Sequence, residues 1–258
     1  MSIRTVRSVS LSTEGIHPLY RDLPIAECGE PLQEIPAVFP RLLPHPYLAA
    51  GAPYGGGSPW QLREGVVAAL EDAQAHLHCY CPGWRIAVFD AYRPLAVQAF
   101  MVWRQFHQEA ALLGCLADLR TVADPVALRE EWPDLYRTLA PAVYRFWGLA
   151  DPDPARPPPH STGAALDCTL VDGEGHLVAM GGPVDDFTAR AVPDFFRKGR
   201  PGSPEAGYHV HRQKLAEAMA ASGFRQHPGE WWHFSLGDQL WAWRAGHPEA
   251  RYGRADLP

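Results

Sequence analysis

The chain has 258 residues, of which 47% are hydrophobic and 20% charged, with a formal net charge of −6. This length is enough to bury a full core without disulfide or metal support, and 9 Trp, 9 Tyr and 10 Phe exclude a disordered protein. Nucleic-acid binding is disfavoured, because no excess of Lys and Arg is present to neutralise phosphates. The 26 Pro and 23 Gly predict short elements joined by long ordered loops.

The chain contains no recognisable export or membrane signal. No apolar run of signal-peptide length follows Arg4 and Arg7, and no stretch approaches the roughly 18 apolar residues that a transmembrane helix needs. The 5 cysteines are odd in number and lack the spacing of a disulfide framework. We therefore expect a cytoplasmic protein with free thiols.

Residues 1–58 are rich in Pro and Gly and lack sustained periodicity, so we expect an extended segment that wraps a domain spanning 59–258. Apolar periodicity and turn residues predict the elements of that domain. The first three are a helix from Pro59 with Ser58 as its N-cap, a buried strand at Trp84–Phe89 and a helix from Pro94 to about Leu113. They are followed by a hairpin of 164–171 and 176–180, a helix at His211–Ser222 and a last strand at Trp231–Leu236. Helices and antiparallel strands alternate without a βαβ rhythm. This favours a single α+β domain with a central antiparallel sheet flanked by helices.

Three blocks concentrate polar residues at the ends of apolar strands or inside them. They are Asp90-Ala-Tyr-Arg-Pro94, His160-Ser-Thr-Gly-Ala-Ala-Leu-Asp167 and Glu230-Trp-Trp-His-Phe234. Each block alone also fits a capped turn with ordinary hydrogen bonds. Together, His160, Asp167 and His233 supply the three His and Asp ligands that a catalytic zinc typically takes. Asp167 interrupts an apolar run, where a buried carboxylate is costly without a cation or a strong donor.

Glu230 would be a second carboxylate close to such a metal, free to move protons. Residues 230 and 233 of a regular strand point to opposite faces, so Glu230 is expected on the turn begun by Pro228-Gly229. A second cluster, His76-Leu-His-Cys-Tyr-Cys81, resembles a soft-metal site. Adjacent ligands rarely fit one tetrahedron, however, and histidine near a helix C-terminus is favourable without metal.

In four blocks the sequence resembles the zinc D-alanyl-D-alanine dipeptidases of the VanX type, within the M15 peptidase group. The matching blocks are Phe89-Asp-Ala-Tyr-Arg-Pro94, His160 to Leu170, Met180-Gly-Gly-Pro-Val-Asp-Asp-Phe187 and Gly229-Glu-Trp-Trp-His-Phe-Ser235. They occur in the family's order, and the resemblance runs from about residue 59 to 244. It implies the DD-peptidase/hedgehog-like α+β fold, whose antiparallel sheet carries the metal.

The resemblance also implies a role for each matching position. One zinc ion per chain would be held by His160, Asp167 and His233. Glu230 would be the general base and acid, and Arg93 would stabilise the oxyanion. Asp185 and Tyr92 would bind the substrate, and Asp185 would anchor its free ammonium group. The implied reaction is Glu-assisted attack of zinc-bound water on the carbonyl of D-alanyl-D-alanine or a similar short D-amino-acid-containing dipeptide. A small dipeptide is therefore the expected partner, with neither nucleic acid nor membrane. The oligomeric state is left open.

Three departures from the family pattern concern substrate recognition. Pro158 stands where many members carry a substrate-binding serine, and the family's N-terminal stretch with its substrate-contacting tyrosine is not recognisable in residues 1–58. The stretch between Arg93 and His160 is long, so residues 114–159 are expected to form an added lid. Candidates for the missing tyrosine are Tyr20, Tyr47 and Tyr54.

Two other functions compete with a dipeptidase. A zinc DD-carboxypeptidase or endopeptidase acting on peptidoglycan stem peptides would use the same metal, but a missing export signal argues against it. A non-catalytic module that binds metal or ligand would keep the fold. Glu230 and Arg93 argue against this second alternative, because a structural zinc needs neither.

Overall fold

The protein is described here from a computed structural model that covers residues 20–145 and 147–255. Its elements are β1 (Leu32–Glu34), α2 (Pro46–Ala49), β2 (Gln61–Arg63), α3 (Glu64–Tyr80), β3 (Arg85–Asp90), α4 (Leu95–Leu112), η1 (Leu116–Leu119), α5 (Pro125–Glu131), α6 (Pro133–Val143), η2 (Pro159–Thr162), β4 (Ala165–Val171), η3 (Ala189–Ala191), α7 (Pro204–Ala221), β5 (Arg225–Gln226), β6 (His233–Ser235) and α8 (Gln239–Ala245). This mixture of helices and antiparallel sheets confirms the predicted α+β class. Within the described residues, no helix is both long and apolar enough to span a bilayer.

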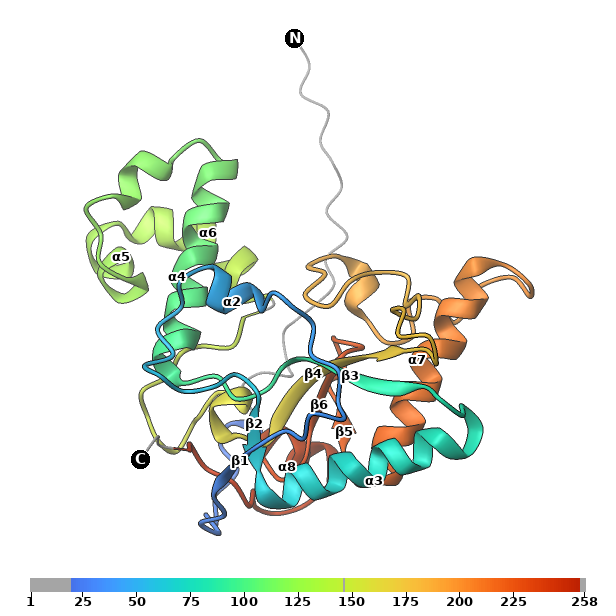
Figure 1. The fold of residues 1–258 in the computed structure, drawn as a ribbon. Helices are drawn as coiled ribbons and strands as arrows, with labels where there is room; N and C mark the ends of the chain where they lie inside the picture. The colour runs from blue at the N-terminus through green and yellow to red at the C-terminus, as the bar shows by residue number, and fades with distance from the viewer. Residues whose placement is uncertain (1–19, 146, 256–258) are drawn as a thin grey trace.

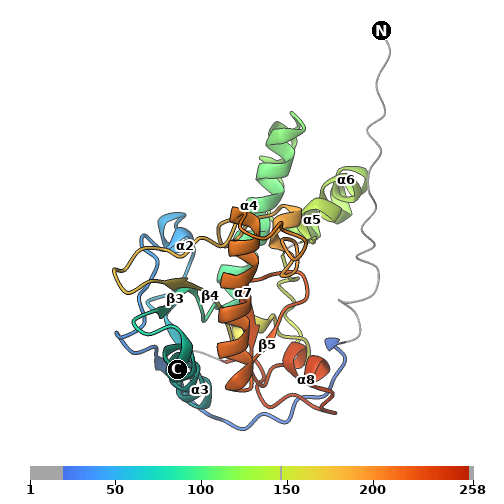
Figure 2. The same ribbon diagram turned by 90° about the vertical axis from the view of Figure 1, so that its right-hand side faces the viewer.

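The central sheet has four antiparallel strands in the order β3-β4-β6-β5, and β1 and β2 form a separate antiparallel pair. Helices α3 and α7 pack against each other beside the sheet (Figure 1). Helices α4, α5 and α6 lie on the left of Figure 1, away from α3 and α7, and in Figure 2 α4 lies behind the upper part of α7. The polar blocks lie on β3, β4 and β6 or next to the ends of these strands.

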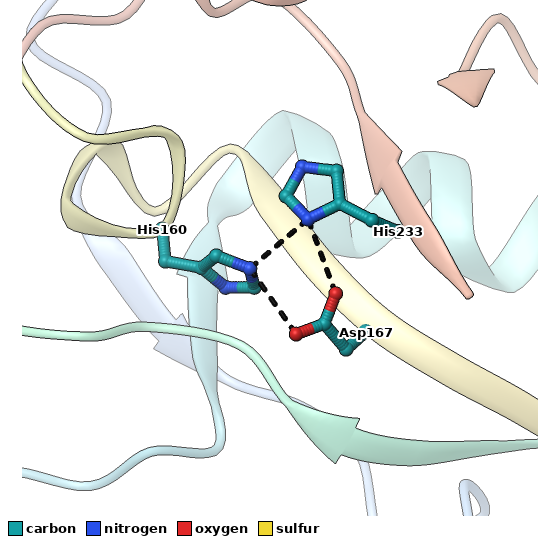
Figure 3. A group of neighbouring side chains, drawn as sticks. All are labelled: His160, Asp167 and His233. Atoms are coloured by element: carbon teal, nitrogen blue, oxygen red, sulfur yellow. Dashed lines mark hydrogen bonds and ion pairs between the residues drawn. The ribbon is translucent and has the colours of Figure 1, made fainter. Parts of the chain in front are cut away.

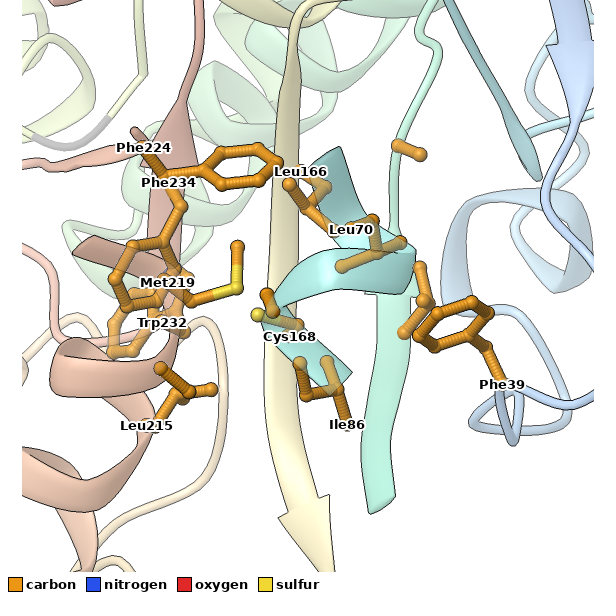
Figure 4. Close-up of a cluster of buried hydrophobic side chains, with 14 of the residues drawn as sticks. Phe39, Leu70, Ile86, Leu166, Cys168, Leu215, Met219, Phe224, Trp232 and Phe234 are labelled. Atoms are coloured by element: carbon orange, nitrogen blue, oxygen red, sulfur yellow. The ribbon is translucent and has the colours of Figure 1, made fainter. Parts of the chain in front are cut away.

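Strand β4 is buried along its whole length and divides its residues between two faces. Leu166, Cys168 and Leu170 belong to the main core, which α3 and α7 complete with Leu70 and Leu215 (Figure 4). Successive side chains of a strand point to opposite faces. Asp167 therefore projects away from this core, on the face where a polar site can form.

A β-bulge in β3 brings a second carboxylate to the polar face. Val88 is paired with Cys168, but the register then shifts and Asp90 is paired with Asp167. A shift of one residue moves a side chain to the opposite face of a strand. Asp90 consequently lies opposite Asp167 instead of entering the main core with Val88.

A second hydrophobic cluster holds the helices of the 114–159 stretch. Helix α4 contributes Val97 and Phe106, and α6 contributes Leu139 and Val143. Trp147 and Tyr47 complete the cluster where it meets the polar face of the sheet. The long segment between Arg93 and His160 thus shares this second hydrophobic cluster with Tyr47, and the cluster reaches the site.

The described part of the N-terminal segment runs along distant parts of the chain. Ile25 forms a bridge with Ala250, and Arg41 forms one with Val88 of β3. Residues 1–19, which begin the predicted wrapping segment, lie outside the described residues.

The first predicted helix begins later than the sequence suggests. Residues Gln61–Arg63 form β2 by pairing with β1, so α3 starts at Glu64 and not at Pro59. Ser58 does not cap the helix: its hydroxyl accepts from the Trp60 amide and donates to Glu34. Pairing with a segment nearly thirty residues earlier overrides the local capping signal.

Three other predictions agree with the structure only in part. The hairpin keeps its turn, but its second arm makes a single bridge, between Leu177 and Val171. Helix α7 begins at Pro204, seven residues before the predicted start, because Ser203 provides the N-cap. The last strand is limited to His233–Ser235. The predicted strand at 84–89 and helix at 94–113 are confirmed within one residue as β3 and α4.

Gly163 connects η2, which carries His160, to β4, which carries Asp167. Its φ is +69°, and an added Cβ would lie 2.3 Å from Leu32 Cδ2. We expect Gly163→Ala to lower the free energy of unfolding by about 1–3 kcal/mol, since left-handed backbone alone costs an L-residue about 1–2 kcal/mol. Urea denaturation measures this, with Gly175→Ala as a control: its φ is +88° but no atom lies within 4 Å of the added Cβ. Equal losses in both variants would exclude a contribution from the Leu32 contact.

Candidate active site and metal centre

His160, Asp167 and His233 converge from three elements on one point (Figure 3). His160 Nε2 lies 3.1 Å from His233 Nδ1 and 3.3 Å from Asp167 Oδ2, and His233 Nδ1 lies 3.1 Å from Asp167 Oδ1. Each residue is at most 5% exposed. Asp167 and His233 are direct partners in the β4–β6 register, so the sheet itself fixes two of the three positions.

Hydrogen bonds outside this trio determine which histidine nitrogens face its centre. His160 Nδ1 donates to the Ala91 carbonyl oxygen at 2.7 Å, which leaves Nε2 as the free acceptor. His233 Nε2 lies 3.3 Å from Ser235 Oγ, and Ser235 in turn donates to Asp238. His233 Nε2 is therefore the donor and Nδ1 the free acceptor. Partners of this kind orient metal-binding histidines and raise their basicity.

The charges of the trio compensate one another. Burial would raise the pKa of Asp167, but His160 and His233 hold it well below its usual range. Burial would lower the pKa of His160, and Asp167 instead raises it. The carboxylate is thus ionised between two imidazoles. Two neutral nitrogens and one carboxylate oxygen that lie within 4.8 Å of one another form a set able to bind a metal ion.

Glu230 lies beside the trio on the turn that the sequence predicts. Pro228 and Gly229 form the turn, and Glu230 follows it ahead of β6. Its Oε2 lies 3.8 Å from His233 Nδ1, and its Oε1 lies 3.9 Å from His227 Nδ1. Burial raises the pKa of Glu230 to about 8, with Asp167 and Asp185 adding to the effect. A carboxyl group with such a pKa can exchange a proton near neutral pH.

Arg93 is buried beside Asp167 of the trio. Its Nη2 lies 3.7 Å from Asp167 Oδ2, and its Nε and Nη2 donate to Asp90 Oδ2 at 3.0 and 2.6 Å. His45 Nε2 lies 3.0 Å from the other oxygen of Asp90. Burial opposes the charge of Arg93, but Tyr47, Asp90 and Asp167 hold its pKa well above the usual value. The guanidinium therefore remains a permanent cation next to the trio.

Asp185 and Tyr47 form a second anionic position in the site. The Tyr47 hydroxyl donates to Asp185 Oδ2 at 2.7 Å, and its ring lies under the Arg93 guanidinium at 4.8 Å. Asp185 has a φ of +59°, a conformation that L-residues other than Asn and Asp rarely adopt. Burial raises the pKa of Asp185 to about 6, and the Asp167 charge raises it further. Such a carboxylate is stabilised by an incoming cation.

A cavity of about 80 Å³ joins these groups. Its lining comprises Tyr20, Tyr47, Arg93, Gln98, Arg145, Trp147, Gly148, Pro158, Pro159, His160, Asp167, Asp185, Phe187, His227, Glu230, Trp232 and His233. Six of the seven residues predicted from the sequence therefore lie around one cavity.

Tyr92 is the predicted site residue that the structure places elsewhere. Its hydroxyl donates to the Ala255 carbonyl oxygen at 2.5 Å, and it is not among the described residues that line the cavity. Asp186, the neighbour of Asp185, is tied to Arg190 at 3.1 Å. Within the described residues, His76, His78, Cys79 and Cys81 form no metal-binding group.

Four residues that line or support the site have no role predicted from the sequence. Asp90 lies inside one of the three polar blocks, and His45, Gln98 and Trp147 lie outside them. The signal for Asp90 was present, because a carboxylate that follows a buried strand and precedes an arginine by three residues can form a buried ion pair. His45, Gln98 and Trp147 reach the site through tertiary contacts that no local pattern shows.

Comparison with known proteins agrees with this geometry. The model of the M15 peptidase family, described as D-ala-D-ala dipeptidase, matches residues 42–251. The chain belongs to this family. The match begins before the predicted residue 59, so it includes Tyr47 and the rest of the α2 region.

Several curated proteins are similar over much of this chain. A protein of Synechocystis sp. named D-alanyl-D-alanine dipeptidase is 42% identical over 92% of this chain and 96% of its own length. A protein of the same name from Enterococcus faecalis is 28% identical over 67% of this chain and 72% of its own length. One from Streptomyces coelicolor is 30% identical over 61% of this chain and 64% of its own length. The resemblance seen in four blocks thus extends over most of the chain.

Proposed function

We propose that the protein is a zinc-dependent dipeptidase that hydrolyses D-alanyl-D-alanine. The observation that carries the proposal is the convergence of His160, Asp167 and His233 beside Glu230 and Arg93, in a chain of the M15 family. The Synechocystis relative, which bears the dipeptidase name, covers almost the full length. Metal analysis of the purified protein, combined with hydrolysis of free D-alanyl-D-alanine, tests the two parts of the proposal.

Zinc fits the donor set of the trio. Two imidazole nitrogens and one carboxylate oxygen are the ligands of many catalytic zinc sites, in which a further position is left for water or substrate. When bound, zinc acts as a Lewis acid and lowers the pKa of water from 15.7 to about 7. His160 and His233 are oriented for such an ion by Ala91 and Ser235. We assign one zinc per chain to this position.

Glu230, beside His233, and Arg93, beside Asp167, have complementary tasks. Glu230 takes the proton of the attacking water and delivers it to the leaving amine, as its raised pKa permits. Arg93 donates to the oxygen that becomes negative when the carbonyl is attacked; loss of one such donor typically costs about 10²- to 10³-fold in rate. Its charge does not change with pH in the working range.

Asp185 binds the free ammonium group of the dipeptide, with Tyr47 holding the carboxylate in place. We expect Asp185→Asn to raise KM by at least about tenfold, since a buried charge-assisted bond contributes about 1.5–3 kcal/mol. Hydrolysis of free and N-acetylated D-alanyl-D-alanine measures the effect, with Asp186→Asn as the neighbouring control. Equal rates on the two substrates in the wild-type protein would exclude the ammonium anchor.

The same panel separates the dipeptidase from a carboxypeptidase of larger stem peptides. A pentapeptide ending in D-alanyl-D-alanine has no free ammonium group next to the scissile bond. The Asp185 anchor therefore favours the free dipeptide over the pentapeptide. Faster cleavage of the pentapeptide would replace the proposed activity with the carboxypeptidase alternative.

We further propose that residues 1–58 wrap the catalytic domain and that residues 114–159 form an inserted lid. The bridges of Ile25 and Arg41 support the first, and the position of Trp147 and Gly148 in the cavity wall supports the second. A cytoplasmic location accords with the free cysteines.

A further inference from the structure

The guanidinium of Arg93 has five N–H groups, and four of them have an acceptor. Nε and one N–H of Nη2 point to Asp90, the other N–H of Nη2 to Tyr47 Oη at 3.2 Å, and one N–H of Nη1 to Gln98 Oε1 at 2.9 Å. For the remaining N–H of Nη1, the described residues offer no acceptor within hydrogen-bond distance. This is the group that can donate to a substrate oxygen.

Because the guanidinium is planar, the direction of one N–H of Nη1 determines the direction of the other. Gln98 therefore helps to fix where the remaining N–H points, together with the hold of Asp90 on the Nε and Nη2 edge. Asp90 holds the Nε and Nη2 edge of the same plane, and Gln98 supplies the acceptor for the Nη1 end.

The amide of Gln98 can adopt only one orientation. Arg93 is purely a donor and the Gly148 carbonyl oxygen is purely an acceptor, so Oε1 faces Arg93 and Nε2 donates to Gly148 at 2.7 Å. Gln98 is 3% exposed, and no water is needed to explain its position. Trp147, next to Gly148, also covers the guanidinium, with its ring centre 5.4 Å from Arg93 Cζ.

We propose that Gln98 is a positioning residue for the hydrolysis: it directs the one uncommitted N–H of Arg93 and anchors that geometry to Gly148 in the 114–159 segment. The effect of Gln98 on the reaction rate rests on the proposed function, because it presupposes that Arg93 takes part in the hydrolysis. The hold of Gln98 on Arg93 is a property of the protein without substrate.

Two substitutions of Gln98 distinguish its hydrogen bond with Arg93 from its hydrogen bond with Gly148. Gln98→Leu removes both bonds, and we expect kcat to fall about 10- to 100-fold with KM little changed, because the loss affects a bond made in the transition state. Gln98→Glu keeps an acceptor for Arg93 and loses the donor to Gly148, so it should recover most of the rate. A Gln98→Glu variant as slow as Gln98→Leu would contradict the role through Arg93.

A double-mutant cycle with Arg93→Ala shows whether Gln98 acts through Arg93. We expect Gln98→Leu to cause no further loss of kcat/KM in the Arg93→Ala background. An equal fractional loss in both backgrounds would overturn the proposal. Gln108→Leu, the same change at an exposed position of α4, is the control and should leave kcat unchanged. Thermal unfolding and zinc content of each variant identify those that fail to fold.

Nitrogen-detected NMR of the arginine side chains tests the hold on Arg93 without substrate. In the zinc-loaded protein we expect slow rotation of the Arg93 guanidinium, visible as separate Nη signals, and averaging of those signals in Gln98→Leu. Averaged signals in the wild-type protein would overturn the proposal even if hydrolysis is fast. A wild-type protein with separate signals but no dipeptide hydrolysis would instead refute the proposed function.

Discussion

Substituting Glu230 by Gln is expected to lower kcat for D-alanyl-D-alanine by about 10²- to 10⁴-fold, the usual contribution of a general base. Gln has nearly the same shape but cannot accept a proton from water. Glu230 lies 3.8 Å from His233 Nδ1, close enough to the trio to serve water bound there. Steady-state kinetics measures the loss, and zinc content should remain at one per chain because Glu230 is not part of the trio.

The matched control for this variant is Glu174→Gln. Glu174 is an exposed carboxylate on the loop after β4, and its replacement by Gln is the same chemical change outside the cavity. We expect kcat to be unchanged in this variant. A Glu230→Gln enzyme that keeps its rate, or one that loses zinc together with activity, would remove the general base from the proposed mechanism.

The cluster of His160, Asp167 and His233 could be predicted because the residue types of its members indicate its chemistry. Asp167 is a carboxylate inside an apolar run, and the alternation of β4 then places it opposite the face that Leu166 and Cys168 bury. His160 and His233 were joined to it by residue type, not by distance. The structure adds the reason for their meeting: His233 is the register partner of Asp167, and Gly163 turns η2 back toward β4.

Helix boundaries show where local signals are insufficient. Ser58-Pro59 and Ser203-Pro204 are the same capping pattern, yet only the second begins a helix. The difference lies in the next three residues, since Gln61–Arg63 finds a strand partner in Leu32–Glu34 and the corresponding part of α7 does not. A pairing between distant segments decides the outcome, and such a pairing is not visible in one sequence window.

The side chains that hold Arg93 could not be predicted, because they too meet through contacts between distant segments. The bulge in β3 changes the face of Asp90, and a shift of one residue has no distinct signature in Val88-Phe-Asp90. Tyr47 lies in the extended segment expected to wrap the domain, as one of three candidate tyrosines, and Gln98 lies in a predicted helix. The Tyr47 hydroxyl donates to Asp185, and Gln98 Oε1 accepts from Arg93. Both hydrogen bonds depend on how α2 and α4 pack beside the sheet.

Removal of the metal by a chelator is expected to abolish hydrolysis and to lower Tm, and added zinc should restore both. A ligand present at 1,000 times its Kd stabilises the folded state by about 4 kcal/mol, and the buried trio offers it three preformed donors. Asp167→Asn should remove most of this effect, because the carboxylate is the only anion of the trio. His78→Ala changes an exposed member of the His and Cys cluster at the end of α3, and this variant should bind zinc and respond to the chelator as the wild type does. If instead His78→Ala lost the zinc and Asp167→Asn kept it, the metal would belong to the α3 cluster and the catalytic assignment of the trio would fall.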